Sequence, residues 1–372
     1  MIAVLIGIAV LAVPFVTYRA NRIVAGEARM LVDALSPILA AGVIAAAFLA
    51  AVAAVVVQWP WLRLAAAALG LMVVTPSVGA SAWFLTPPGN TFARISPALG
   101  FWLLALALGL LVADSLTRLR LSPWARLAAL AVAAAFVALL LLSGAWNGLS
   151  ILKEYATRAD GFWREAGQHL FLALGSLLAA CLVGLPLGIL CHRAPRLRAA
   201  ILPVLSIVQT IPSIALFGIL MVPLGYLATA VPLAAELGIR GIGGAPALVA
   251  LFLYSLLPIV GNTVVGLAQV PAAVVEAARG MGLSDRQRLT QIELPLALPV
   301  ILTGIRIVLV QNLGLATVAA LIGGGGFGTF VFQGIGQTAI DLVLLGAIPT
   351  VALAFTAAVI LDAAIDLANG HD

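Results

Sequence analysis

Long apolar runs alternate with short polar stretches along the whole chain. Each run is long enough for a helix of about 20 residues, the length that crosses the hydrocarbon core of a bilayer. The pattern predicts ten membrane spans, at Met1–Tyr18, Pro37–Val57, Leu64–Leu85, Ile95–Asp114, Arg126–Trp146, His169–Cys191, Ala199–Tyr226, Pro246–Leu267, Leu298–Leu321 and Ile340–Ala364.

One polar interruption is longer than the others. Residues 147–168 mix charged residues with Ile, Leu, Tyr, Phe and Trp, which is typical of an amphipathic helix lying on a membrane surface. We expect this linker to separate an N-terminal membrane region of about five spans (1–146) from a C-terminal region of five spans (169–372).

Composition supports a membrane protein. The 372 residues are 63% hydrophobic and 9% charged, whereas a soluble domain has about 25% charged residues. The apolar runs are continuous rather than alternating, so we predict an all-α polytopic protein in a lipid bilayer and not a β-barrel. The net charge of +5 is spread over short loops and does not indicate a nucleic-acid partner.

Arginines in the second half indicate an orientation. Six lie in two predicted loops, 192–198 and 268–297, while the two alternate loops carry one, Arg240. Because short loops on the cytoplasmic side of a membrane are enriched in basic residues, we expect loop 268–297 and the C-terminus to be cytoplasmic.

The polar island inside loop 268–297 has helix-forming and helix-breaking residues in a definite order. Glu276 to Met281 favours a helix, Gly282 permits a sharp turn, and Ser284 is placed to cap a second short helix. Asp285 follows in the first turn of that helix, and Pro295 is expected to end it.

The spacing of this island is Glu-Ala-Ala, three residues, Gly, nine residues, Ile, one residue, Leu-Pro. It resembles the coupling-loop motif of permease subunits of ABC importers, and every anchor position matches. Gln209–Ser213, Pro246–Leu251 and Ala319–Gly323 are also similar to permeases of the osmoprotectant branch, which take up glycine betaine, choline and carnitine. The similarity covers about residues 148–366.

The resemblance implies a five-helix type I importer core in a bacterial inner membrane. It implies a dimer of ABC ATPase subunits, a second permease of the same or a related chain, and an extracytoplasmic solute-binding protein as partners. The implied solute is a small zwitterionic or quaternary ammonium osmolyte. The residues implied in ATPase coupling are Glu276, Ala277, Ala278, Arg279, Gly282, Asp285, Arg286, Arg288, Ile292, Leu294 and Pro295.

No enzyme site is indicated by the sequence. Lys153 is the only lysine, and no Gly-Lys-Ser/Thr phosphate loop occurs, so ATP would be bound by a partner chain and no cofactor by this one. The three histidines and two cysteines have no metal-ligand spacing. We therefore predict a transport subunit without catalytic or metal-binding residues.

Polar residues inside spans are candidates for a translocation path, because they are costly in a bilayer. The candidates are Gln209, Thr210, Ser213, Asn262, Thr263, Gln311 and Asn312. Each of them also fits the alternative role of an interhelical hydrogen bond. A solute such as an amino acid is an open alternative. An ion-coupled secondary transporter is less favoured, because the aspartates fall near span ends.

Two further features have no assigned role. Residues 323–328 read Gly-Gly-Gly-Gly-Phe-Gly, which predicts a tight turn on the outer side, either a plain connection or part of an outer gate. Arg306 lies about two turns inside its span, and we expect its side chain to reach towards the cytoplasmic face.

Overall fold

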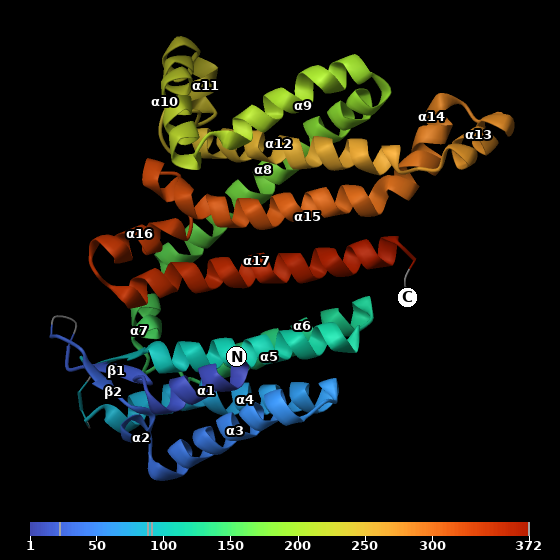
Figure 1. Cartoon of the computed structure of the whole chain (residues 1–372). Coiled ribbons are helices and arrows are strands. Elements are labelled where there is room, and N and C mark those ends of the chain that lie inside the picture. Colours follow the sequence, from blue (N-terminus) through green and yellow to red (C-terminus); the bar gives the residue numbers. More distant parts are fainter. Residues whose placement is uncertain (22–23, 88, 91, 371–372) are drawn as a thin grey trace. The chain divides into compact units, whose positions relative to one another are not determined.

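The computed structural model describes residues 1–21, 24–87, 89–90 and 92–370 and is largely helical (Figure 1). The predicted cytoplasmic C-terminus, residues 371–372, lies outside the described part. The chain divides into two compact units, Met1–Thr157 and Arg158–Asp372. Within the described residues, nine helices are long and apolar enough to cross a bilayer. The helical polytopic fold is thereby confirmed, with one span fewer than predicted.

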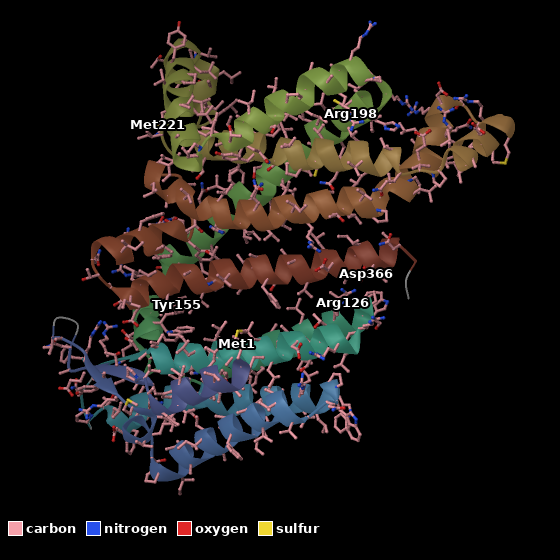
Figure 2. The ribbon with its side chains drawn as sticks, viewed as in Figure 1. Met1, Arg126, Tyr155, Arg198, Met221 and Asp366 are labelled. Atoms are coloured by element: carbon pink, nitrogen blue, oxygen red, sulfur yellow. The ribbon has the colours of Figure 1, made fainter. Side chains whose placement is uncertain are left out.

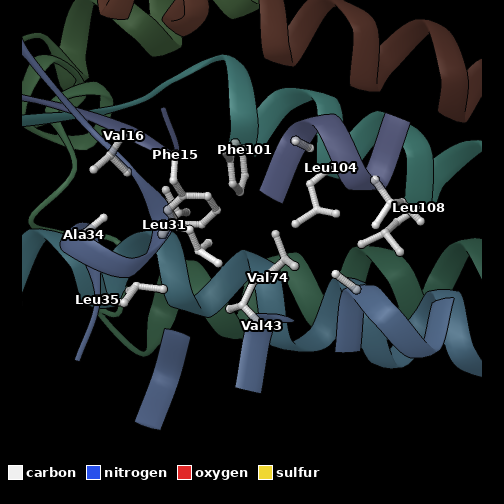
Figure 3. Close-up of a cluster of buried hydrophobic side chains, with 14 of the residues drawn as sticks. Phe15, Val16, Leu31, Ala34, Leu35, Val43, Val74, Phe101, Leu104 and Leu108 are labelled. Carbon is white, nitrogen blue, oxygen red and sulfur yellow. The ribbon is translucent and has the colours of Figure 1, made fainter. Parts of the chain in front are cut away.

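The N-terminal unit is built on helices that pack side by side. Helices α3, α4 and α5 enclose apolar side chains such as Val43, Val74 and Leu108 (Figure 3). A fourth long helix, α6, buries little of its surface in the described structure. The four candidate spans of the N-terminal unit are α3 (Pro37–Val56), α4 (Pro60–Leu85), α5 (Leu99–Leu119) and α6 (Pro123–Leu142).

The first apolar run does not form the predicted span. Helix α1 (Ile2–Leu11) is about 15 Å long, half of the bilayer core. Pro14 has no N–H to continue the helix, and the chain becomes extended as β1 (Val16–Arg19). The first span predicted at Met1–Tyr18 is therefore wrong, because the helix ends after ten residues.

A small sheet, which the sequence pattern did not predict, lies at one end of this unit. Its strand order is β2-β1-β3, all antiparallel, with β2 at Glu27–Arg29 and β3 at Arg94–Pro97. Two short helices accompany it, α2 (Leu31–Ala34) and α7 (Ser150–Ala156). Glu154 on α7 is buried beside Arg94 of β3, with 3.4 Å between the charged atoms.

The opposite end of the unit is tied together by Arg63. Its Nε and Nη2 atoms donate to the carbonyls of Val57 and Ala54, at 2.7 and 3.0 Å. Its Nη1 atom lies 3.1 Å from Asp114 on α5. One guanidinium therefore satisfies terminal carbonyls of α3 and connects the ends of three helices.

The C-terminal unit is organised around α12 (Gly244–Ala268). This helix packs against α8 and α15, and α17 packs against α15 and α16 (Figure 1). Five of the candidate spans are in this unit, as predicted. The remaining bounds are α8 (Ala159–Arg193), α9 (Pro195–Thr210), α10 (Ser213–Ala230), α11 (Pro232–Glu236), α15 (Leu294–Val318), α16 (Gly328–Gly336) and α17 (Ile340–Ala368).

Two predicted elements differ in the structure. The linker over 147–168 is not one amphipathic helix, because α8 begins at Ala159 and continues without interruption to Arg193. The span predicted at Ala199–Tyr226 consists of α9 and α10, which meet at Ile211 and Pro212. Pro212 lacks an N–H and favours an extended residue before it, and Ile211 is extended.

Candidate functional site

The segment between α12 and α15, residues 269–293, projects from one end of the C-terminal unit (Figure 1). It contains α13 (Ala272–Gly280), α14 (Asp285–Arg288) and a π-helical turn at Leu289–Glu293. Charged side chains gather at this end, where Arg198 is labelled in Figure 2. We call residues 269–293 the α12–α15 segment.

The turn between α13 and α14 depends on Gly282. Its φ angle is +82°, a left-handed conformation that favours glycine. The N–H of Gly282 bonds to the carbonyl of Arg279, and the N–H of Leu283 bonds to that of Ala278. These two bonds form a Schellman motif, which satisfies the last carbonyls of α13. The turn predicted at Gly282 is confirmed.

Helix α14 starts with a capping box. The Ser284 hydroxyl accepts from the N–H of Gln287 at 3.3 Å, and the Gln287 side chain accepts from the N–H of Ser284 at 2.9 Å. This reciprocal pair satisfies two donors at the start of the helix. The cap predicted at Ser284 is therefore confirmed.

Arg288 makes internal contacts within the α12–α15 segment. Its Nε atom lies 2.7 Å from the Glu293 carboxylate, and its Nη1 atom lies 3.0 Å from Asp285. Glu293 is buried, so this ion pair holds the π-helical turn against α14. Arg193, at the end of α8, adds a hydrogen bond to the Asp285 carbonyl. Arg288 thus positions the segment, and its predicted contact with the ATPase stays a prediction.

Pro295 does not end a helix, contrary to the sequence prediction. It directly follows the π-helical turn, so its missing N–H falls where the regular helical bonding pattern is already interrupted. The π-helical turn before it has one extra residue per turn and leads α14 directly into α15. The segment and the apolar helix are consequently one continuous helical stretch from Asp285 to Val318.

The outer surface of the α12–α15 segment is mixed in character. Among the predicted coupling residues, those with exposed side chains include both acidic and basic groups, while Ala278 is buried under the Schellman turn. Met281 adds an apolar side chain that is 71% exposed. Ile292 and Leu294 are half-buried. The exposed predicted residues are Glu276, Ala277, Arg279, Gly282, Asp285, Arg286 and Pro295.

A second polar feature is the break between α9 and α10. The side-chain amide of Gln209 donates to the Tyr254 carbonyl at 2.7 Å, and the Tyr254 hydroxyl donates to the Ile211 carbonyl. Pro258, four residues after Tyr254, has no N–H for that carbonyl. Each helix therefore satisfies a main-chain carbonyl that the other helix leaves free.

Two predicted path residues flank this break. Thr210 is exposed, and its hydroxyl donates to the Ile207 carbonyl at 2.7 Å. Ser213 is half-buried at the first position of α10. Together with Gln209 they give the break a polar surface among apolar side chains.

Asn312 is used for packing instead of lining an open path. It is fully buried, and its Nδ2 atom lies 2.9 Å from the hydroxyls of both Ser176 and Ser255. These contacts join α15 to α8 and α12. Of the two roles left open by the sequence, path residue and interhelical hydrogen bond, the structure favours the second for Asn312.

The other predicted path residues are dispersed. Thr263 is fully buried, and its hydroxyl donates to the Ile259 carbonyl. The Asn262 amide donates to the carbonyl of Pro258 at 2.8 Å and is half-buried. Gln311 is also half-buried. The structure therefore brings together Gln209, Thr210 and Ser213, and not the full predicted set.

Sequence reasoning missed one intramembrane ion pair. Arg306 on α15 pairs with Asp362 on α17, so its guanidinium has a partner within the unit and was not simply reaching for the membrane face. The signal was available, because an arginine inside a span requires a nearby acidic or polar partner. Tyr254 was missed as well, although Pro258 marks a carbonyl in need of a donor.

Two family models match the chain. Residues 184–369 match the family model described as "Binding-protein-dependent transport system inner membrane component". Residues 1–152 match the model described as "ABC transporter permease YehY, N-terminal domain".

Curated proteins are similar to about half of the chain. The osmoprotectant import permease protein OsmW of Salmonella typhimurium is 42% identical over 49% of this chain and 79% of its own length. OsmY of the same organism is 41% identical, over 58% of this chain and 84% of its own. The glycine betaine/carnitine/choline transport system permease protein OpuCB of Bacillus subtilis is 35% identical, over 51% and 80%.

Proposed function

The chain belongs to the family of binding-protein-dependent transport system inner membrane components, and on that basis we propose that it imports a small osmoprotectant. The proposed solutes are zwitterionic or quaternary ammonium compounds such as glycine betaine. The observation that carries the proposal is the match of residues 184–369 to the permease family, with similar permeases that are named for osmoprotectants. As a multi-pass membrane subunit, it would form half of the pore.

The proposed orientation places the α12–α15 segment in the cytoplasm. The arginines at this end support it, since Arg193 contacts the segment directly and Arg279 and Arg286 are exposed on it. The turn after α15 lies at the other end of the helix and would face outward. The last turn of α17 would lie on the cytoplasmic side, in an inner membrane.

An ATPase subunit would dock on the exposed part of the segment. Glu276 and Arg279 offer charges of both signs, and Met281 offers an apolar contact. Such a mixture suits a groove that combines an apolar floor with a charged rim. Arg288 would contribute indirectly, by holding α14 against Glu293. ATP would be bound and hydrolysed by the partner chain, with a second permease and a solute-binding protein completing the importer.

The translocation path would pass the break between α9 and α10. In a bilayer, backbone outside regular helix is tolerated where it is buried in protein or lines a polar cavity. Gln209, Thr210 and Ser213 surround this break, which supports their role as path residues. A polar lining without carboxylates suits a zwitterionic solute such as glycine betaine.

The test is uptake of labelled glycine betaine by vesicles that contain the chain, its ATPase subunit and its binding protein. We expect ATP-dependent uptake that unlabelled betaine competes away. A complex that assembles and hydrolyses ATP but takes up no betaine, choline or carnitine would contradict the proposed solute.

A further inference from the structure

The glycine-rich turn at residues 323–328 connects α15 to α16 and has no role in the proposed docking. It follows a short 3₁₀ helix, Ala319–Ile322. Gly323, Gly325 and Gly326 have φ angles of +77°, +75° and +85°, so the turn requires glycine at three positions for its backbone alone. A turn of this shape exposes backbone N–H groups that attract an anion.

One turn of α8 supplies that anion and two further contacts. The Glu165 Oε2 atom accepts from the N–H of Gly326 at 2.7 Å and from the Thr329 hydroxyl at 3.3 Å. Gln168 donates its side-chain amide to the Gly324 carbonyl at 2.9 Å. The His169 ring lies 5.0 Å from the Phe327 ring. Residues at positions i, i+3 and i+4 of one helical face thus contact consecutive parts of the turn.

The fit between α8 and the turn is close. A Cβ atom added at Gly325 would lie 3.0 Å from the Glu165 carboxylate, and one at Gly326 would lie 3.1 Å from the His169 ring. The residue just before the turn contacts the start of α12, because the N–H of Gly243 bonds to the Ile322 carbonyl at 2.8 Å. Glu165 itself has a side chain that is only 15% exposed.

We propose that Glu165 is a latch that holds the outward-facing end of the permease core closed in this conformation. Its carboxylate joins α8 to the turn that precedes α16, while Gly243 joins the 3₁₀ helix before the turn to α12. A carboxylate suits this role because its oxygens only accept, and one oxygen here receives two donors. The side assigned to this end, and the effect on transport, rest on the proposed function, whereas the contact itself does not.

The direct test is hydrogen exchange of the amides at residues 323–329 in the purified full-length chain in lipid nanodiscs. In Glu165→Ala the Gly326 N–H loses its acceptor, and we expect exchange of this segment to accelerate at least tenfold. Asp160→Ala is the matched control, since Asp160 is an exposed carboxylate in the first turn of the same helix, whereas Arg164 is unsuitable because it lies 3.8 Å from the Glu165 carboxylate. Exchange that is the same in wild type and Glu165→Ala overturns the latch.

Glu165→Gln provides a second variant if the alanine variant does not fold. Its amide oxygen still accepts but carries no charge, so we expect faster exchange than in wild type, by a smaller factor. Equal exchange in Glu165→Gln and wild type would contradict the need for a carboxylate.

The role in transport is tested with the complete complex. Loss of the latch should raise ATP hydrolysis without binding protein at least threefold and lower the solute imported per ATP. Faster exchange with unchanged hydrolysis and uptake would overturn the role of the contact in transport. Faster exchange in a complex that transports no osmoprotectant would support the latch and count against the proposed solute.

Discussion

Gln209 and Tyr254 each donate a side-chain hydrogen bond to a main-chain carbonyl at an interruption of the other's helix. Gln209 donates to the carbonyl of Tyr254, which Pro258 leaves without its usual helical partner, and Tyr254 donates to the Ile211 carbonyl beside Pro212. The two prolines therefore weaken two helices at one level of the C-terminal unit. Both weak points are stabilised by the same pair of side chains.

Replacing Tyr254 with Phe should leave the Ile211 carbonyl without a donor. An unsatisfied buried carbonyl costs about 1–3 kcal/mol, so we expect a lower melting temperature of the detergent-solubilised protein. If the break lines the path, the KM for uptake should rise. Copurification of the ATPase subunit should stay at the wild-type level.

Tyr226→Phe is the matched control for that variant, because Tyr226 is 74% exposed and lies on α10, the helix that follows the break. A Tyr254→Phe protein with wild-type melting and uptake would contradict the importance of the reciprocal pair.

Reversing the charge of Glu276 should abolish uptake while the chain stays folded in the membrane. The side chain is exposed on α13, so Glu276→Lys removes no internal contact that holds the unit together and acts at the docking surface. Copurification of the ATPase subunit measures the loss directly. Glu236→Lys, an exposed glutamate on α11, should leave copurification intact. Normal uptake by the Glu276 variant would show that docking occurs elsewhere.

Alanine at Gly282 should weaken ATPase binding by changing the shape of the α12–α15 segment. The left-handed conformation costs an L-residue about 1–2 kcal/mol, which corresponds to roughly tenfold weaker binding if the turn must keep its shape in the complex. Binding of the ATPase subunit to the permease in nanodiscs gives the dissociation constant.

Gly280 provides a control two residues away. It is the last residue of α13 and has no atom within 4 Å of an added Cβ, so Gly280→Ala should bind the ATPase as well as wild type. Equal weakening by both substitutions would point to lost contact area instead of turn geometry.

Replacing Asn312 with Ala separates packing from solute contact. The substitution leaves the hydroxyls of Ser176 and Ser255 without their shared partner, so the melting temperature should fall. KM for solute should stay near the wild-type value, because Asn312 is fully buried. A Gln311→Ala variant, altered at the half-buried neighbour, serves for comparison. A large rise in KM for Asn312→Ala would return this residue to the path.

Local chemistry accounts for what could be predicted from the sequence. Gly282 and Ser284 act on their immediate neighbours, so their turn and cap could be recognised without a structure. The long apolar helices could be placed for the same reason. The break at Pro212 also had a local signal, which the continuous hydropathy of that run concealed.

Contacts between distant segments explain the rest. The strand Val16–Arg19 pairs directly with Arg94–Pro97, although two long helices separate them in the sequence. No short-range pattern indicates that pairing. Arg288 resembles a free surface cation until the π-helical turn brings Glu293 to it. Asn312 and Gln311 are adjacent polar residues, and only their rotation about the helix axis separates packing from partial exposure.

The absence of a helix stop at Pro295 has a mechanical consequence. Helix α14, the π-helical turn and α15 form one rod from Asp285 to Val318, roughly 50 Å long at 1.5 Å per residue. Bending at the π-helical turn and at Pro299 inside α15 absorbs part of a tilt applied near Asp285, and the rest moves the far end by an amount that grows with distance from the pivot. The position of the pivot depends on Asn312, which hydrogen-bonds this helix to α8 and α12 close to the end that carries the glycine-rich turn.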